Sequence, residues 1–206
     1  SSPNSGFAIE KKNYEVSFNA GTNIAKFDNQ SLYLSKTTLL EKTYIFPYAN
    51  IYGNLKFGKS KSICAMYDYT VSFPKGSQIL PVLNVSNPLN TFIGNSTLDL
   101  IKYHNVNFNF RNYDYSTRSG YSIYFGGDFY DSQVVSNTTF DSSGKRSTTY
   151  DNVAGVYETW TGYNWNKTYK KEAHTFKYGF GGNVQVNKYK GFTNSQMYEA
   201  NSIRLV

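Results

Sequence analysis

The sequence is poor in cysteine, in charge and in long apolar runs. It contains one cysteine, Cys64, so no internal disulfide framework can form. Charged residues make up 17% of the 206 residues, against about 25% in an average soluble domain. No apolar run approaches the 18 residues of a membrane helix, and we therefore expect neither a membrane span nor a remaining signal segment. These shortages exclude a disulfide scaffold, a coiled coil and a helical membrane anchor.

Aromatic and small polar residues fill the chain instead. There are 20 Tyr, 15 Phe and 23 Asn, and aromatic residues reach 18% of the total. So many aromatic side chains argue against disorder and favour a β-rich globular protein. The net charge of +7 is spread along the chain without a zinc-finger spacing, an RNA-binding aromatic motif or a recognition helix. We therefore expect no nucleic-acid partner.

Apolar and polar residues alternate with period 2 along almost the whole chain. The pattern is clearest over residues 63–73, 104–110 and 174–180, and it predicts strands with one buried and one polar face. Glycine pairs at Gly126-Gly127 and Gly181-Gly182 indicate turns. Several short strands with tight turns indicate an all-β sandwich or barrel, and we expect a single Ig-like β-sandwich with no helix of ten residues. Further strands are expected at residues 14–20, 31–35, 43–57, 78–84, 120–130, 133–140, 153–163, 183–189 and 197–206.

The N-terminal region, residues 1–20, is predicted to be an extension or donor strand, and residues 21–206 to be the head domain. The chain starts at Ser1 without Met, as a processed protein would. An alternating strand with a complete apolar face can begin its own sheet, or it can be donated to a neighbouring molecule. The C-terminal strand, with Ile203 and Leu205 on one face, is a second candidate for exchange. The apolar residues of the proposed donor strand are Phe7, Ile9, Tyr14, Val16 and Phe18.

Motifs for catalysis are weak. Residues 53–60 match the phosphate-binding pattern G-x-x-x-x-G-K-[ST], but a strong strand pattern follows where that motif needs a helix. His104 and His174 lie on predicted apolar faces, and no Cys/His cluster offers a metal site. The acids Asp128 and Asp131 have no feature that marks them as a glycosidase pair. We expect no enzyme activity, no metal and no cofactor.

Two surface chemistries remain open. The aromatic residues Trp160, Tyr163 and Trp165 could form a platform for sugar stacking, or they could fill the core and its flanks. Five N-x-[ST] sequons are present, about as many as chance predicts for this composition. If the protein is exported in an organism that N-glycosylates, the acceptors are Asn29, Asn84, Asn95, Asn137 and Asn166.

The apolar strand at residues 7–18, the Tyr/Asn/Thr-rich β body, the processed start and the sequons together resemble the subunits of archaeal surface filaments called threads. Those subunits are similar to bacterial type I pilins, in which the N-terminal strand of one subunit completes the sandwich of the next. The resemblance implies an extracellular, N-glycosylated homopolymer joined head to tail, with a role in adhesion or biofilm. Unlike the bacterial pilins, this chain has no disulfide pair. The alternative function is a secreted carbohydrate-binding or pore-forming module.

Overall fold

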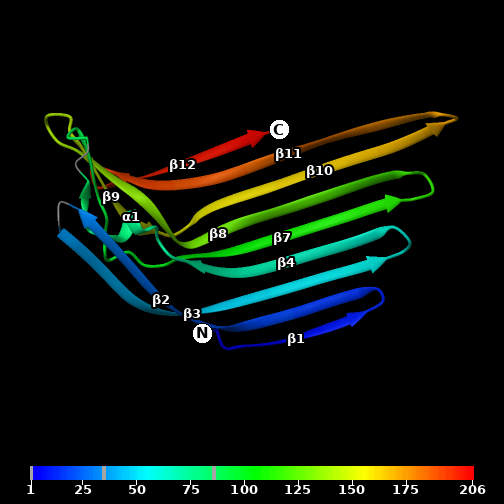
Figure 1. Ribbon diagram of the computed structural model, residues 1–206. Helices are drawn as coiled ribbons and strands as arrows, with labels where there is room; N and C mark the ends of the chain where they lie inside the picture. The colour runs from blue at the N-terminus through cyan, green and yellow to red at the C-terminus, as the bar shows by residue number, and fades with distance from the viewer. Residues whose placement is uncertain (1, 34–35, 85–86) are drawn as a thin grey trace.

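The computed structural model describes residues 2–33, 36–84 and 87–206 (Figure 1). Almost all of them are in strands, which confirms the predicted all-β class. One short helix, α1 (Gly76–Ile79), is present in this part of the chain. The strands are β1 (Asn4–Lys11), β2 (Tyr14–Tyr33), β3 (Lys36–Phe57), β4 (Lys61–Ser72), β5 (Leu83–Asn84), β6 (Asn90–Ile93), β7 (Ile101–Asp114), β8 (Ser119–Phe140), β9 (Arg146–Val153), β10 (Val156–Lys171), β11 (His174–Thr193) and β12 (Gln196–Leu205).

The strands form one 12-stranded sheet, and the two-sheet arrangement of an Ig-like sandwich is not confirmed. Nine of them follow the order β1-β2-β3-β4-β7-β8-β10-β11-β12, in which each strand is antiparallel to the next. The three short strands β5, β6 and β9 lie off this path. The expected domain boundary at residue 20 falls inside β2, which pairs with both β1 and β3.

Two glycine pairs that were expected to form turns lie inside long strands, so those turn predictions are wrong. Gly126 and Gly127 belong to β8, and Gly181 and Gly182 belong to β11. A Cβ atom at Gly126 would lie 2.7 Å from the Trp160 indole on the neighbouring strand. Gly126 leaves room for the Trp160 ring to lie over its backbone. The ring in turn shields this backbone, which has no side chain of its own to cover it.

The strand expected at residues 78–84 is also wrong over most of its length. The segment starts with the helix α1, whose first turn is closed because the backbone N–H of Lys75 donates to Oε1 of Gln78 at 2.9 Å. Ile79 at the end of this helix is fully buried. Residues 120–130 and 133–140, expected as two strands, belong to the single strand β8.

A small apolar core lies where the short elements meet the sheet, at the end where α1 and β9 gather (Figure 1). The aromatic ring of Phe73 stacks on Phe27 at 5.2 Å and meets Tyr44 and Phe46 edge-on. Thr138 and Thr148 bridge β8 and β9 within the same region. The described apolar side chains that are buried are Phe46, Ile79, Leu80, Leu98, Leu100, Val153 and Val156.

The β11–β12 hairpin turn predicts a stabilising substitution. Asn194 and Ser195 both have positive φ, 50° and 64°, as a two-residue type I′ turn requires. Glycine adopts this conformation without the Cβ clash, so Ser195→Gly should raise the free energy of unfolding by about 0.5–1 kcal/mol. Thermal or urea unfolding measures the change. As a control, Gly144→Ala, at φ 79° with open space around it, should destabilise, and a neutral result for both variants would contradict the strain argument.

Candidate functional site

The two faces of the long sheet differ in chemistry. Residues directly opposite each other in antiparallel strands lie on the same face, so the strand register assigns every side chain to a face. One face, called here the apolar face, carries apolar and aromatic side chains from the first strand to the last. Its members include Phe7, Ile9, Val16, Phe18, Ile51, Leu55, Ile63, Tyr67, Val106, Phe108, Phe110, Ile123, Phe125, Phe129, Tyr163, Trp165, Phe180, Val184, Val186, Ile203 and Leu205.

The apolar face is largely uncovered. Rings pair across strands, as Phe108 does with Phe125 at 5.9 Å and Trp165 with Phe180 at 5.1 Å, but they remain open on the outer side. The exposed fraction is 48% for Phe125 and 60% for Phe180. The accessible surface of the chain is 13282 Å², against roughly 9,700 Å² for a compact protein of its mass. Monomers rarely expose apolar patches above a few hundred Å², so this face needs a partner.

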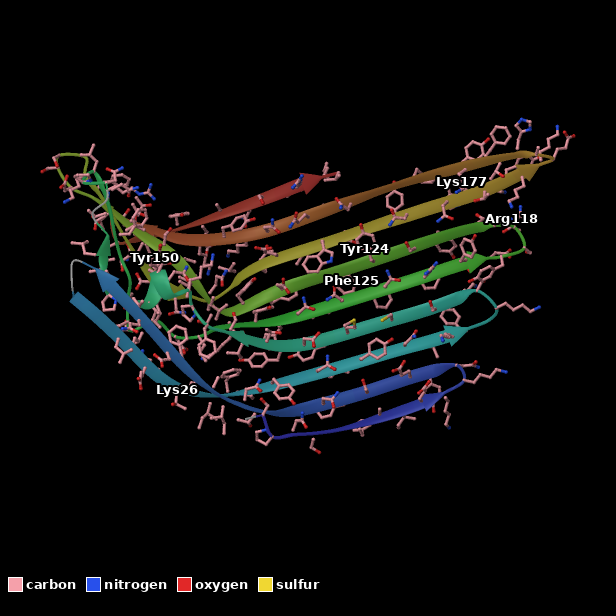
Figure 2. The ribbon with its side chains drawn as sticks, in the orientation of Figure 1. Lys26, Arg118, Tyr124, Phe125, Tyr150 and Lys177 are labelled. Atoms are coloured by element: carbon pink, nitrogen blue, oxygen red, sulfur yellow. The ribbon has the colours of Figure 1, made fainter. Side chains whose placement is uncertain are left out.

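The opposite face is polar. Asn50 donates from Nδ2 to Oδ1 of Asp68 at 2.5 Å, and Asn105 donates in the same way to Asp128. These pairs belong to one row of residues that runs across the sheet. Tyr124 lies on this face and its sequence neighbour Phe125 on the other (Figure 2). The polar face has the hydrogen-bonding groups of a surface that meets water.

Unpaired backbone groups lie, among the described residues, along β1, along the outer side of β12 and along part of β11. In β1, the carbonyl of Pro3 accepts from the N–H of Thr22, so the odd-numbered residues bond to β2 and the even-numbered residues 4–10 point outward. In β11, Asn183 exchanges both bonds with Val206 at the end of β12. Val206 is the last described residue, and the odd-numbered residues 175–181 point toward an edge that no other described strand covers, called here the vacant edge. β1 and the uncovered part of β11 therefore present four outward-pointing residues each.

An apolar groove lies beside the vacant edge of β11. It is lined by residues of β8, β10, β11 and the end of β12, and Leu205 is one of its walls. Its volume is about 650 Å³. Its apolar walls are Ile123, Tyr163, Val184, Leu205 and Val206.

The hairpin tips are strongly cationic. The turns β1–β2, β3–β4, β7–β8 and β10–β11 all lie at the same end of the sheet (Figure 1). A cavity of about 380 Å³ at the first two turns is lined by no carboxylate. Its cations are Lys12, Lys56, Lys59, Lys61 and Arg111. This concentration of positive charge favours an anionic partner.

The five residues of the proposed donor strand do not lie in one strand, as expected, but are divided between the two strands of the β1–β2 hairpin. Phe7 is opposite Phe18, and Ile9 is opposite Val16, on the apolar face. Phe7 and Ile9 are 56% and 48% exposed. Tyr14 lies at the tip of the hairpin, opposite Lys11. β1 occupies the edge of its own sheet, and its donation to another molecule stays a prediction.

The other candidate residues do not gather into one site. Trp160 lies on the polar face, whereas Tyr163 and Trp165 lie on the apolar face, so the structure does not bring the three together as a platform. Asp128 bonds Asn105 on the polar face, and Asp131 bonds Nε2 of His104. The second candidate histidine, His174, is exposed at the start of β11.

The segment that matches the phosphate-binding pattern is a β-hairpin. Its first part ends β3, Gly58 turns the chain with φ 63°, and β4 starts at Lys61. Backbone N–H groups in strands are used by the sheet and do not converge on a phosphate. Among the described residues, no group of three or more His, Cys, Asp or Glu could hold a metal ion.

The sequon asparagines differ in accessibility. Asn166 is exposed on β10. The amide nitrogen of Asn95 donates to the carbonyl of Tyr150 at 2.9 Å, and that of Asn137 donates to Asp151 at 2.7 Å, so both are occupied by internal bonds. The side chains of Asn29 and Asn84 lie outside the described part of the structure.

The chain matches no family model, no curated protein and no solved structure. Over the described ranges, none of the helical segments has the length and apolar character needed to cross a membrane.

Sequence reasoning missed the continuity of the apolar face and the clustering of charge. The alternation of each strand was visible, but which strands are neighbours was not. Lysines that are scattered in the sequence meet at the hairpin tips because every second turn of the meander lies at the same end. The excess of lysine at every second expected turn was the signal in the sequence that could have revealed this cluster.

Tyr130 on the polar face predicts a loss of stability in alkali. Burial of the ring, and after it the negative charges of Asp128 and Glu158, raise the pKa of Tyr130 from 10.0 to about 12. Between these values the unfolded chain releases the proton and the folded chain keeps it, so the free energy of unfolding should fall as the pH rises from 10.0 to about 12. When the free energy of unfolding is measured against pH, it should fall less steeply for Tyr130→Phe than for the unaltered protein. The exposed Tyr115→Phe is the control, and equal slopes for both would contradict this assignment.

Proposed function

We propose that this chain is a structural subunit of an extracellular surface filament, in which copies join head to tail by adding the edge strand β1 of one molecule to the vacant edge of β11 in the next. The observation that carries the proposal is the presence of two open strand edges with matching direction, length and face. Such an edge is a template for pairing with a further strand.

The strand directions of β1 and β11 suit antiparallel pairing, because the nine strands of the main path alternate in orientation. β1 and β12 run the same way, and β11 runs opposite to both. A second copy in the same orientation therefore presents its β1 antiparallel to β11, in line with the end of β12. This contact is heterologous, since it uses two different surfaces, and it can be repeated indefinitely.

The bonding groups and faces also match. Residues 4, 6, 8 and 10 of β1 and residues 175, 177, 179 and 181 of β11 point their backbone groups outward, and both sets have their side chains on the polar side. Pairing them in full places Gly6 opposite Gly179 and Ala8 opposite Lys177. Phe7 then faces Tyr178 on the apolar face. Each large apolar side chain covered at such a junction contributes about 1.5–3 kcal/mol.

The exposed sequon residue Asn166 extends the proposal to glycans and to an extracellular location. N-linked glycans are placed at the exposed Asn166 of an exported protein, where they would stand at the polar face. The polymer would act in adhesion or biofilm, with neighbouring copies of the chain as its partners. It needs no cofactor and no catalytic residue.

Blocking the β1 edge tests the proposal. Ala8→Pro removes one outward N–H and leaves the bonds between β1 and β2 intact, so it should abolish or strongly shorten polymers seen by negative-stain electron microscopy. Ala8→Val keeps the N–H and is the matched control, with circular dichroism to verify folding. Absence of polymers in the unaltered protein would overturn the function, and normal polymers of Ala8→Pro would exclude the β1 edge.

A disulfide trap tests the register. With Cys64→Ser as background, Phe7→Cys and Tyr178→Cys should form intermolecular disulfides and a ladder of oligomers on non-reducing gels, because opposite residues of neighbouring strands have the Cβ spacing of a disulfide. Phe7→Cys with Phe192→Cys is the control, since β12 covers β11 at that position. Equal ladders from both pairs would contradict the proposed junction.

A further inference from the structure

We infer that the apolar face rests against the acyl chains of a lipid bilayer with anionic headgroups, and that the cationic hairpin tips lie in the headgroup layer. The inference uses the sheet face and the tips, which the edge junction leaves free. It identifies the partner that covers the large exposed surface.

The width of the apolar face fits the hydrocarbon layer. From Tyr121 to Phe129 in β8, and from Ile63 to Val71 in β4, each side chain on this face is apolar or aromatic, apart from one glycine. Each stretch is roughly nine residues long, which is the length that an inclined strand needs to cross the hydrocarbon core. Lys61 precedes the β4 stretch and Lys102 lies opposite its end, so charged groups begin where the apolar stretch stops.

Charge favours lipid over a second copy as the occupant. At the opposite end of the sheet, lysines are neutralised by their own carboxylates, in the pairs Lys26–Glu41, Lys102–Asp99 and Lys188–Glu199. A second copy packed face to face with its tips at the same end would place its own cationic cavity, which no carboxylate lines, against these tips. An anionic bilayer attracts each lysine or arginine near its surface and so complements them.

The cavity at the tips suits a phosphate-bearing headgroup. Its walls supply four lysine ammonium groups and the guanidinium of Arg111, which can donate two parallel hydrogen bonds to phosphate oxygens. The same β4 strand that starts at this cavity continues along the apolar face with Ile63. One lipid molecule could therefore meet both surfaces, with its phosphate at the tips and its chains along the face.

The inference rests on the proposed function in one respect. Backbone groups in the hydrocarbon layer need hydrogen-bond partners, and the inner strands of the main path supply them to each other. The open edges at β1 and β11 would be satisfied by the junction between copies. A sheet that stays single would keep these edges in the hydrated headgroup layer.

The two tryptophans of the chain test the inference, because Trp165 lies on the apolar face and Trp160 on the polar face. The variant Trp160→Phe leaves Trp165 as the single tryptophan, and Trp165→Phe leaves Trp160. The probes are vesicles of phosphatidylcholine with phosphatidylglycerol, prepared with and without brominated acyl chains. We expect bromine to quench Trp165 at least threefold more strongly than Trp160, with a blue shift of Trp165 emission on binding.

The outcomes are distinct. Equal quenching of both tryptophans, or no vesicle binding, would overturn the inference. Shielding of Trp165 from acrylamide without vesicles, together with a dimer mass in sedimentation, would assign the face to a second copy. Polymers that form normally without any quenching would overturn the lipid contact and leave the proposed function standing. Quenching of Trp165 in monomeric Ala8→Pro would support lipid contact without the edge junction.

Charge reversal tests the headgroup part. The double variant Lys59→Glu and Arg111→Glu should weaken binding to phosphatidylglycerol vesicles by about tenfold or more at low salt, since contacts to anionic lipid depend on charge. Lys145→Glu, in the exposed turn before β9, is the control and should change binding little. Equal effects of the two variants would exclude the tip cavity as the headgroup site.

Discussion

A single layer of sheet cannot bury its own apolar face, and this constraint governs the whole molecule. In a sandwich, a second sheet about 10 Å away would cover the rings of Phe108, Phe125 and Phe180. Here the strands continue sideways in one sheet, and the covered core is confined to one end near α1 and β9. Burial of apolar surface is the main favourable term in folding, so the remaining face must contribute through a partner. The lipid contact that we propose supplies that partner.

The edges impose a second constraint of the same kind. The inner strands of the main path have partners on both sides, but among the described residues β1, the outer side of β12 and part of β11 keep rows of unpaired N–H and C=O groups. Edges of this kind are usually protected by short strands, charges or proline. Lys177 is one charge on the open part of β11, yet Gly179 and Gly181 beside it offer no obstacle to a neighbouring strand. Edge pairing and face covering use different surfaces, so one copy can take part in both.

The predictability of the fold differed from element to element. Residues 63–73 and 104–110 were correctly predicted as strands, because alternation over so many residues is specific to a half-exposed sheet. The turns expected at Gly126-Gly127 and Gly181-Gly182 were wrong, because the cross-strand contacts that explain these glycines, such as Trp160 over Gly126, join residues distant in sequence. The prediction of a strand at residues 78–84 was wrong because a short helix there buries Ile79 in the core. Of the candidate site, the apolar residues between positions 7 and 18 were expected in one strand but form the β1–β2 hairpin, and the vacant edge of β11 was not recognised.

The sequence by itself determined the all-β class, the alternating faces of each strand and the lack of catalytic motifs, since these depend on composition and on neighbours in the chain. Only the tertiary structure decided that the strands form one sheet, that Trp160 and Trp165 lie on opposite faces of it, and that scattered lysines gather at the hairpin tips. The physical reason is register: a shift of one residue in the pairing of two strands moves every side chain to the other face, and pairing partners are distant in sequence. The surfaces on which the proposed function depends are therefore products of strand order and register.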